Sequence, residues 1–145
     1  MANKSKEKGT RAEYKIRDLL RQKTGLDWQR VPMSGAGHTK GDLYVPNEKN
    51  LYCIECKSYK EDHLSSKIII NKTNNLIDWW NQAIEQATKT STEPILFYKW
   101  DRSKIYVGVS NKPIAKINYI YINFLNLYVC SAEDYLNNEK IKWIK

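Results

Sequence analysis

Two segments of this sequence, residues 41–45 and 51–57, bring acidic and basic side chains together at a spacing suited to catalysis. They read Gly-Asp-Leu-Tyr-Val and Leu-Tyr-Cys-Ile-Glu-Cys-Lys with a polar break between them, which is typical of two short strands joined by a tight connection. If the second strand folds back on the first, Asp42 lies opposite Glu55, with Cβ atoms about 4.5–5.5 Å apart. Because successive side chains of a strand point to opposite faces, Lys57 lies on the face of Glu55. We therefore expect these three side chains to converge.

Two carboxylates at this distance repel each other, so such an arrangement usually needs a cation between them. Mg²⁺ suits it, with Mn²⁺ as a substitute, because Mg²⁺ takes hard oxygen ligands and commonly uses one or two carboxylates together with substrate phosphates. Lys57 adds a fixed positive charge beside the metal. A metal, two carboxylates and a lysine next to a phosphate predict a site of phosphodiester hydrolysis.

The competing interpretation of the same residues is a solvated hairpin face with an ordinary cross-strand ion pair. The flanking residues argue against it. Val45 and Tyr52 are apolar and share the opposite face with Leu43, which pairs with Ile54, so the hairpin is expected to be buried. Cys53 is apolar as well and lies on the acidic face, so that face is not simply a wet surface.

A helix predicted from Thr10 to Gln22 offers a third acidic side chain, Glu13. Its apolar residues recur at helical spacing, and Glu13 lies beside the stripe they form. Glu13 could close a capping box with Thr10, or it could serve the site as a third acidic ligand or a water-positioning group. The pattern leaves both interpretations open.

Residues 32–40, Pro-Met-Ser-Gly-Ala-Gly-His-Thr-Lys, form a Gly-rich polar loop that leads directly into Asp42. The backbone amides of such a loop can approach phosphates, and Arg30 before it and Lys40 at its end could hold them. Plain turn chemistry is the alternative explanation for the glycines. Lys99, inside a strand predicted over residues 94–100, is a further candidate for phosphate contact.

The composition predicts a single domain that binds a polyanion. The chain has 145 residues, a formal net charge of +8 and a pI of about 9.3, although a Lys-rich composition alone could produce that charge. An odd cysteine count, no secretory signal and no segment of transmembrane length predict a reduced, cytoplasmic protein with no membrane partner. Cys53 and Cys56 form a C-x-x-C motif, but positions three apart on a strand face opposite sides, which disfavours zinc.

The order of predicted elements is a helix, three strands, a helix over residues 75–88, further strands, and a terminal helix that begins after Ser131 and carries Ile141 and Trp143. This order predicts an α/β fold in which a mixed β-sheet is flanked by helices. We expect residues 1–8 to be a mobile basic tail and residues 9–145 to be a single domain.

Taken together, these motifs resemble the PD-(D/E)XK nuclease superfamily, and within it the archaeal-type Holliday junction resolvases and their phage relatives. The resemblance covers about residues 8–109 and implies a restriction-endonuclease-like fold. Gly41 stands where many members have proline, and we expect that difference to affect only the entry to the strand. The residues that carry the resemblance are Lys8-Gly9-Thr10-Arg11-Ala12-Glu13, Arg30-Val31-Pro32-Met33-Ser34-Gly35, Gly41-Asp42 and Glu55-Cys56-Lys57.

The resemblance also assigns catalytic roles. It implies that Asp42 and Glu55 bind Mg²⁺ together with the backbone carbonyl of Cys56. Lys57 would orient or activate the attacking water and stabilise the pentavalent phosphorus. Glu13 would be a third acidic group that touches the metal through water.

For DNA, the resemblance implies that Arg30 and Ser34 contact phosphates and that the loop from Gly35 to Lys40 reaches into a branched substrate. It further implies a homodimer whose two sites cut opposing strands of a four-way junction, with roles in DNA recombination and repair and an origin compatible with a phage or mobile element. The predicted function is a structure-selective endonuclease, a Holliday junction resolvase that leaves a 5′-phosphate and a 3′-hydroxyl. The alternatives are a nuclease of the same superfamily with a restriction or repair target, and a basic DNA-binding module without catalysis.

Overall fold

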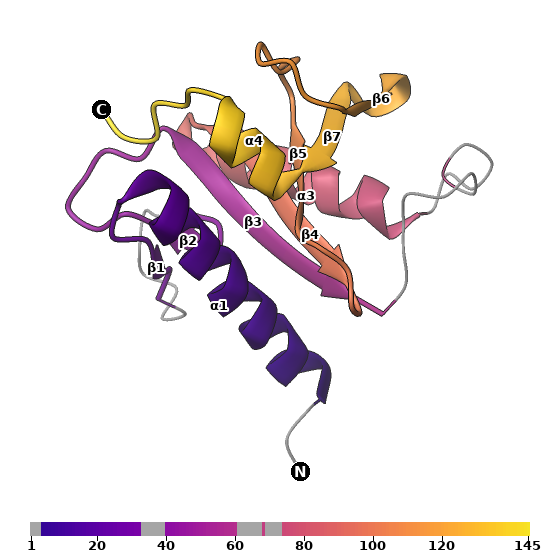
Figure 1. Ribbon diagram of the computed structural model, residues 1–145. Coiled ribbons are helices and arrows are strands. Elements are labelled where there is room, and N and C mark those ends of the chain that lie inside the picture. The colour runs from indigo at the N-terminus through magenta and orange to yellow at the C-terminus, as the bar shows by residue number, and fades with distance from the viewer. Residues whose placement is uncertain (1–3, 33–39, 61–67, 69–73) are drawn as a thin grey trace.

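The computed structural model describes residues 4–32, 40–60, 68 and 74–145. They form one seven-stranded sheet with helices on both faces, in the strand order β1-β2-β3-β4-β5-β7-β6 (Figure 1). The predicted fold class, a mixed sheet flanked by helices, is confirmed. No helix in these ranges is long and apolar enough to cross a membrane. The elements are α1 (Lys4–Thr24), β1 (Gln29–Arg30), β2 (Leu43–Tyr44), β3 (Tyr52–Tyr59), α3 (Asn75–Thr90), β4 (Glu93–Trp100), β5 (Tyr106–Val109), β6 (Ile120–Ile122), the 3-10 turn η1 (Asn123–Leu125), β7 (Leu127–Ser131) and α4 (Ala132–Asn138).

The sheet is mixed because its two long central strands, β3 and β4, run parallel along their whole length, from Tyr52 opposite Glu93 to Tyr59 opposite Trp100. Parallel neighbours need a crossover connection, and α3 lies in the chain between them. The remaining strand pairs are antiparallel. β3 and β4 therefore form the centre of the sheet, and β3 is also the second strand of the acidic hairpin, residues 41–57.

Both faces of the central strands are buried, which gives the fold its three layers. Ile54 and Phe97 pack with Ile16 of α1 on the face that α4 also covers. Leu96 packs with Trp80 of α3 on the opposite face. Figure 1 shows α1 and α4 in front of the sheet and α3 behind it. The alternation of side chains along β3 and β4 thus fixes α1 next to the hairpin.

The first helix begins at Lys4, so the predicted start at Thr10 is wrong and the helix includes residues 4–8. Lys and Glu in this stretch are strong helix formers, and Gly9 costs only about 1 kcal/mol relative to alanine, so nothing stops the helix there. Thr10 is consequently inside the helix and does not cap it, which rules out the capping box with Glu13. Residues 1–3 lie outside the described part of the chain.

The last helix is shorter than predicted. Ser131 caps it as expected, but α4 ends at Asn138, and Ile141 and Trp143 follow it in an extended segment. Trp143 packs edge-on against Trp28, with ring centroids 5.4 Å apart. The spacing of apolar residues alone could not distinguish a longer helix from an extended segment held against the core by the ring of Trp143.

We predict that Ile16→Ala will destabilise the protein by about 2–5 kcal/mol, because Ile16 is fully buried between α1 and the sheet and the truncation leaves a cavity. Urea denaturation measures the change. Asp18→Ala, on an exposed side chain of the same helix, should stay within about 0.5 kcal/mol of the parent. Equal effects of the two variants would contradict the packing described for α1.

Candidate active site

The acidic hairpin is held together through the backbone and carboxylate of Asp42. Leu43 pairs with Ile54, as the sequence predicted, and the Asp42 N–H donates a hydrogen bond to the Ile54 carbonyl at 2.6 Å. The Asp42 carbonyl accepts one from the Val31 N–H at 2.9 Å. The Asp42 carboxylate then accepts a hydrogen bond from the Cys56 N–H at 2.7 Å. These bonds fix the carboxylate against β3, beside the neighbouring Glu55.

Gly41 makes this close approach possible, which sequence reasoning did not anticipate. Its φ of +89° lies in the left-handed region, and a Cβ atom there would lie 2.7 Å from the Ile54 oxygen and 3.0 Å from Cys53 Sγ. Proline cannot replace it in this conformation, because its ring holds φ near −65°. Gly41 therefore does more than shape the entry to the strand, since it lets the chain turn Asp42 into the site.

Glu55 is the buried acid of the site, with only 4% of its surface exposed. Burial raises its pKa to about 8, and the negative charge of Asp42 adds to the shift while Lys57 opposes it. A buried carboxyl in this state binds a proton or a cation in preference to standing ionised and alone. The carboxylates of Glu55 and the partly buried Asp42 contact each other. Both are hard oxygen donors, and they fit a divalent metal ion.

Glu13 borders this pair but is held by another residue. Its carboxylate accepts a hydrogen bond from Arg30 Nε at 2.7 Å. Partial burial raises the pKa of Glu13, the Arg30 hydrogen bond acts against that shift, and the charge of Asp42 adds to it. In the described part of the chain, no three or more His, Cys, Asp or Glu side chains form a group that could hold a metal. A metal bound by Asp42 and Glu55 would therefore need further ligands from the backbone, water or substrate.

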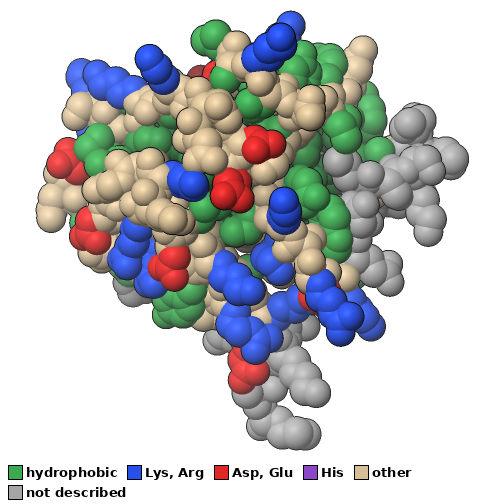
Figure 2. All heavy atoms as spheres, viewed as in Figure 1, with side chains coloured by type: hydrophobic (Ala, Val, Ile, Leu, Met, Phe, Trp, Pro, Cys, Tyr) green, Lys and Arg blue, Asp and Glu red, His purple; other side chains and the backbone are tan. Residues whose placement is uncertain are grey.

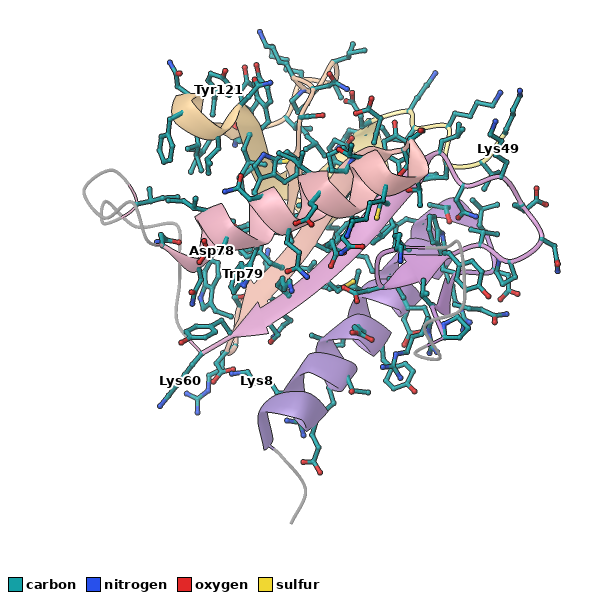
Figure 3. All side chains as sticks on the ribbon, turned by 180° about the vertical axis from the view of Figure 1, so that it is seen from behind. Lys8, Lys49, Lys60, Asp78, Trp79 and Tyr121 are labelled. Atoms are coloured by element: carbon teal, nitrogen blue, oxygen red, sulfur yellow. The ribbon has the colours of Figure 1, made fainter. Side chains whose placement is uncertain are left out.

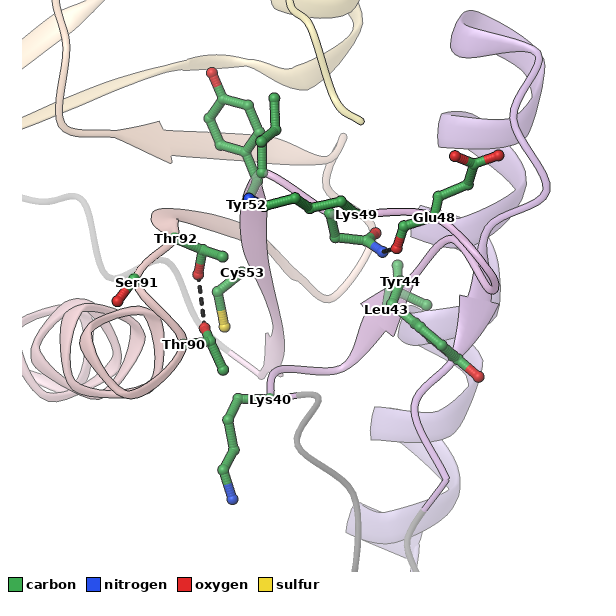
Figure 4. Close-up of a pocket in the computed structure, with 12 residues that line it drawn as sticks. Lys40, Leu43, Tyr44, Glu48, Lys49, Tyr52, Cys53, Thr90, Ser91 and Thr92 are labelled. Carbon is green, nitrogen blue, oxygen red and sulfur yellow. Dashed lines mark hydrogen bonds between the residues drawn. The ribbon is translucent and has the colours of Figure 1, made fainter. Parts of the chain in front are cut away.

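Lys40 lies at the rim of a pocket of about 360 Å³ between the β2–β3 hairpin and the C-terminal end of α3 (Figure 4). Cys53 lines the same pocket, whereas Cys56 lies in the core beside α1, so the two cysteines of the C-x-x-C motif face opposite sides as expected. Ser34 and Gly35 fall outside the described residues.

Lys99 lies in a basic groove that the sequence analysis missed. The groove runs between the first turns of α1 and the ends of β3 and β4, where Lys8, Arg11 and Lys15 face Lys99. Partial burial lowers the pKa of Lys99, and the nearby charge of Lys15 lowers it further. Asp101 forms an ion pair with Lys8. The spacing of the three α1 residues, at i, i+3 and i+7, is the signal that could have revealed this face.

The space-filling view shows how these cations gather. Lys and Arg side chains crowd the lower half of the visible face, over α1 and the strand ends beside it (Figure 2). From behind, Lys8 and Lys60 are seen at the same end of the molecule (Figure 3), and both charges act on Asp101. The groove is thus part of a wider positive surface.

Comparison with known proteins assigns the chain to a family. The sequence matches the family described as "Phage putative PDDEXK endonuclease" over residues 4–144, and the chain belongs to that family. Protein D14 of Escherichia phage T5 is 40% identical over 118 residues, which is 77% of this chain and 74% of that protein. Hjc, a Holliday junction resolvase from the archaeal hyperthermophile Archaeoglobus fulgidus, matches with 21% identity, a TM-score of 0.43 and coverage of 92% of both chains.

The family defines a nuclease of PD-(D/E)XK type, which confirms the predicted superfamily. Such nucleases generally use divalent metal ions and act on DNA. The matched range includes every residue of the hairpin and the whole of α1, so the candidate site lies inside the region that matches the family.

We predict that Gly41→Ala will lower both stability and nuclease activity. The added methyl group collides with the Ile54 carbonyl at an unfavourable φ, so the chain must withdraw Asp42 from β3. Thermal unfolding and a DNA cleavage assay measure the two effects. Gly25→Ala is the matched control, because Gly25 also has a positive φ but has nothing within 4 Å of its Cβ position. It should cost stability through φ alone and leave cleavage close to that of the parent.

We predict that Glu55→Gln will stabilise the metal-free protein, and more so as pH rises. The folded protein binds the Glu55 proton more tightly than the unfolded chain does, so this residue weakens folding as pH climbs from about 4.5 toward about 8. The gain in Tm should grow through that window and then level off. Melting curves in EDTA check this, and Glu85→Gln makes the same change on an exposed helix surface as the matched control. A gain that stays constant with pH would contradict the burial of an acidic Glu55.

Proposed function

We propose that this protein is a Mg²⁺-dependent, structure-selective DNA endonuclease that acts as a homodimer on four-way junctions. It would serve DNA recombination or repair in the cytoplasm of a cell that carries a phage or mobile element. The observation that carries this proposal is the contact between buried Glu55 and Asp42, whose carboxylate is fixed by the Cys56 amide. A protein that only binds DNA has no use for a buried acid that contacts a second, partly exposed acid.

Asp42 and Glu55 would hold Mg²⁺, or Mn²⁺ in its place, together with the backbone carbonyl of Cys56. The Asp42 carboxylate is suited to this because the Cys56 amide keeps one of its oxygens in a fixed position. When bound, the metal would supply positive charge that offsets the negative charge gained by the phosphate in the transition state.

Lys57 and Glu13 would act on water and phosphate. Lys57 would orient water for in-line attack and stabilise the added negative charge with its ammonium group. The water oxygen bonds to phosphorus as the bond from phosphorus to the 3′ oxygen breaks. The water releases a proton and the 3′ oxygen gains one, which leaves a 5′-phosphate and a 3′-hydroxyl. Glu13, held by Arg30, would position the water from the side of α1.

The DNA backbone would follow the positive surface around the site. Arg30, Lys40 and Lys99 would contact phosphates, as would Ser34 and Gly35 in the loop before Lys40. The groove that Lys99 shares with α1 supports a path along that helix. Phosphate contacts of this kind give affinity and register but read little sequence.

The choice of a four-way junction rests on the ordered motifs that resemble the archaeal-type resolvases. Two copies would present two sites to opposing strands, and selectivity would come from the geometry of the pair. Two alternatives would replace the junction resolvase. One is the same chemistry on a restriction or repair target, and the other is a DNA-binding module without catalysis.

The test is cleavage with Mg²⁺ of a synthetic four-way junction beside a linear duplex, a nicked duplex and a Y-fork of the same sequence. We expect paired nicks in opposing strands of the junction and no cutting of the linear duplex. Cutting of all four substrates would retain the nuclease and discard the resolvase.

Glu55→Ala and Lys57→Ala are the site controls. Each should lower cleavage by several orders of magnitude while junction binding survives, because each removes a group proposed to act on the reacting phosphate or its metal. Normal cutting by both would refute the site. Calorimetry with Mn²⁺ on the parent and on Glu55→Ala reports metal binding separately from cleavage. If neither protein binds Mn²⁺ in the presence of DNA and neither cleaves it, the binding module without catalysis is favoured.

A further inference from the structure

The longest uncharged stretch of the sequence lies at one edge of the sheet. Residues 117–132 contain no Asp, Glu, Lys, Arg or His, although charged residues make up 28% of the chain. This stretch forms β6, η1 and β7, and β6 is the last strand in the sheet order. Figure 3 shows Tyr121 of β6 at the end of the molecule farthest from α1.

The side chains along this edge are large, apolar and exposed. Tyr119, Ile120, Tyr121 and Phe124 have between 37% and 57% of their surface exposed. Tyr121 stacks on Tyr128 of β7, with ring centroids 4.4 Å apart, so the aromatic rings are held in place and do not swing freely. Isolated exposed apolar residues are normal, whereas a contiguous group usually marks an interaction surface.

The strand itself is open to pairing. β6 is hydrogen-bonded to β7 along one side, and no other described strand pairs with it. Proteins normally protect such an edge with lysine, with proline or with a bulge. The residues of β6, Ile-Tyr-Ile, include none of the charged or proline residues that would do so. A strand left in this condition is suited to receive another strand.

We propose that β6 is the surface through which two copies of this chain pair, with the two β6 strands antiparallel across a two-fold axis. The inference rests on the homodimer of the proposed function and names the surface that forms it.

Charge selects a second copy as the partner. Each chain carries a net charge of +8, so two copies repel unless they meet where neither presents charge. A two-fold axis places each β6 residue against β6 residues of the other copy, and like charges directly opposite would destabilise the pair. An uncharged strip avoids that penalty. At the other edge of the sheet, β1 carries Arg30, which would oppose its own copy.

A contact between two copies would have to extend beyond the β6 strand itself. A stable interface buries about 800 Å² on each partner, which three residues of strand alone cannot supply. Tyr121 pairs with Tyr128 and Ile120 with Val129, so their side chains alternate between the two faces of the sheet. Tyr119 and Phe124 extend the apolar surface at either end of the strand.

The mass of the full chain in solution, without DNA, tests the proposal by sedimentation or light scattering. The parent should have twice the mass of one chain, 17.1 kDa. Ile120→Lys with Phe124→Lys should halve it, because the lysines place like charges across the axis. Ile114→Lys is the matched control, since Ile114 is 95% exposed but precedes the uncharged stretch, and it should leave the mass unchanged. Circular dichroism confirms that the variants are folded.

Cross-linking decides the matter even if the lysine variant fails to fold. Cys53, Cys56 and Cys130 are all buried, so an added surface cysteine is the reactive one. A short bifunctional thiol reagent should join two copies of Tyr121→Cys and leave Ile114→Cys as single chains. Equal linking of both variants, or none of Tyr121→Cys, would overturn the β6 interface.

The outcomes separate this inference from the nuclease. A dimer that the lysine pair does not disturb would refute the surface and leave the homodimer standing. A parent chain of single mass, both free and bound to a junction, would refute both the surface and the homodimer. Cleavage by the same preparation, measured on the four substrates, reports the nuclease independently of either result.

Discussion

The site depends on the contact between Asp42 and the backbone of β3. The Asp42 amide donates a hydrogen bond to the Ile54 carbonyl, and the Asp42 carboxylate accepts one from the Cys56 amide. These two bonds decide where β2 stops pairing and where the carboxylate lies. The pairing of the Asp42 and Glu55 carboxylates follows from that position, because Glu55 lies between the two residues of β3 that Asp42 contacts. Gly41 is the residue that lets the chain come close enough, and a side chain there would collide with the strand.

This contact leaves the protein with a buried acid next to another acid, an arrangement that weakens folding until a proton or a cation is present. Glu55 responds with a raised pKa, and Lys57 only partly offsets the cause. Functional sites commonly lower the stability of the fold in this way. The rest of the fold compensates through burial on both faces of β3 and β4, where α1 and α3 exclude water from the central strands. In the proposed site, metal binding and folding stability would therefore be coupled through the carboxyl group of Glu55.

Charge is distributed unevenly over the surface, and the distribution matches two kinds of partner. Cations concentrate on α1 and the adjacent ends of β3 and β4, where Lys99 is partly buried among other lysines. At the opposite end of the sheet, β6 and β7 carry none. A polyanion suits the first region and another uncharged surface suits the second. Separation of the two regions would allow DNA to bind without opposing the pairing of two chains.

The sequence by itself determined the hairpin, its register and the convergence of Asp42 with Glu55, because strand alternation and antiparallel pairing are local rules that act over a few residues. It also determined the mixed sheet flanked by helices. Only the tertiary structure decided that Arg30 holds Glu13 and that Lys99 joins a groove with α1. These facts depend on which elements pack side by side. Contacts between residues far apart in the chain are set by the burial of whole faces, and no local spacing records them.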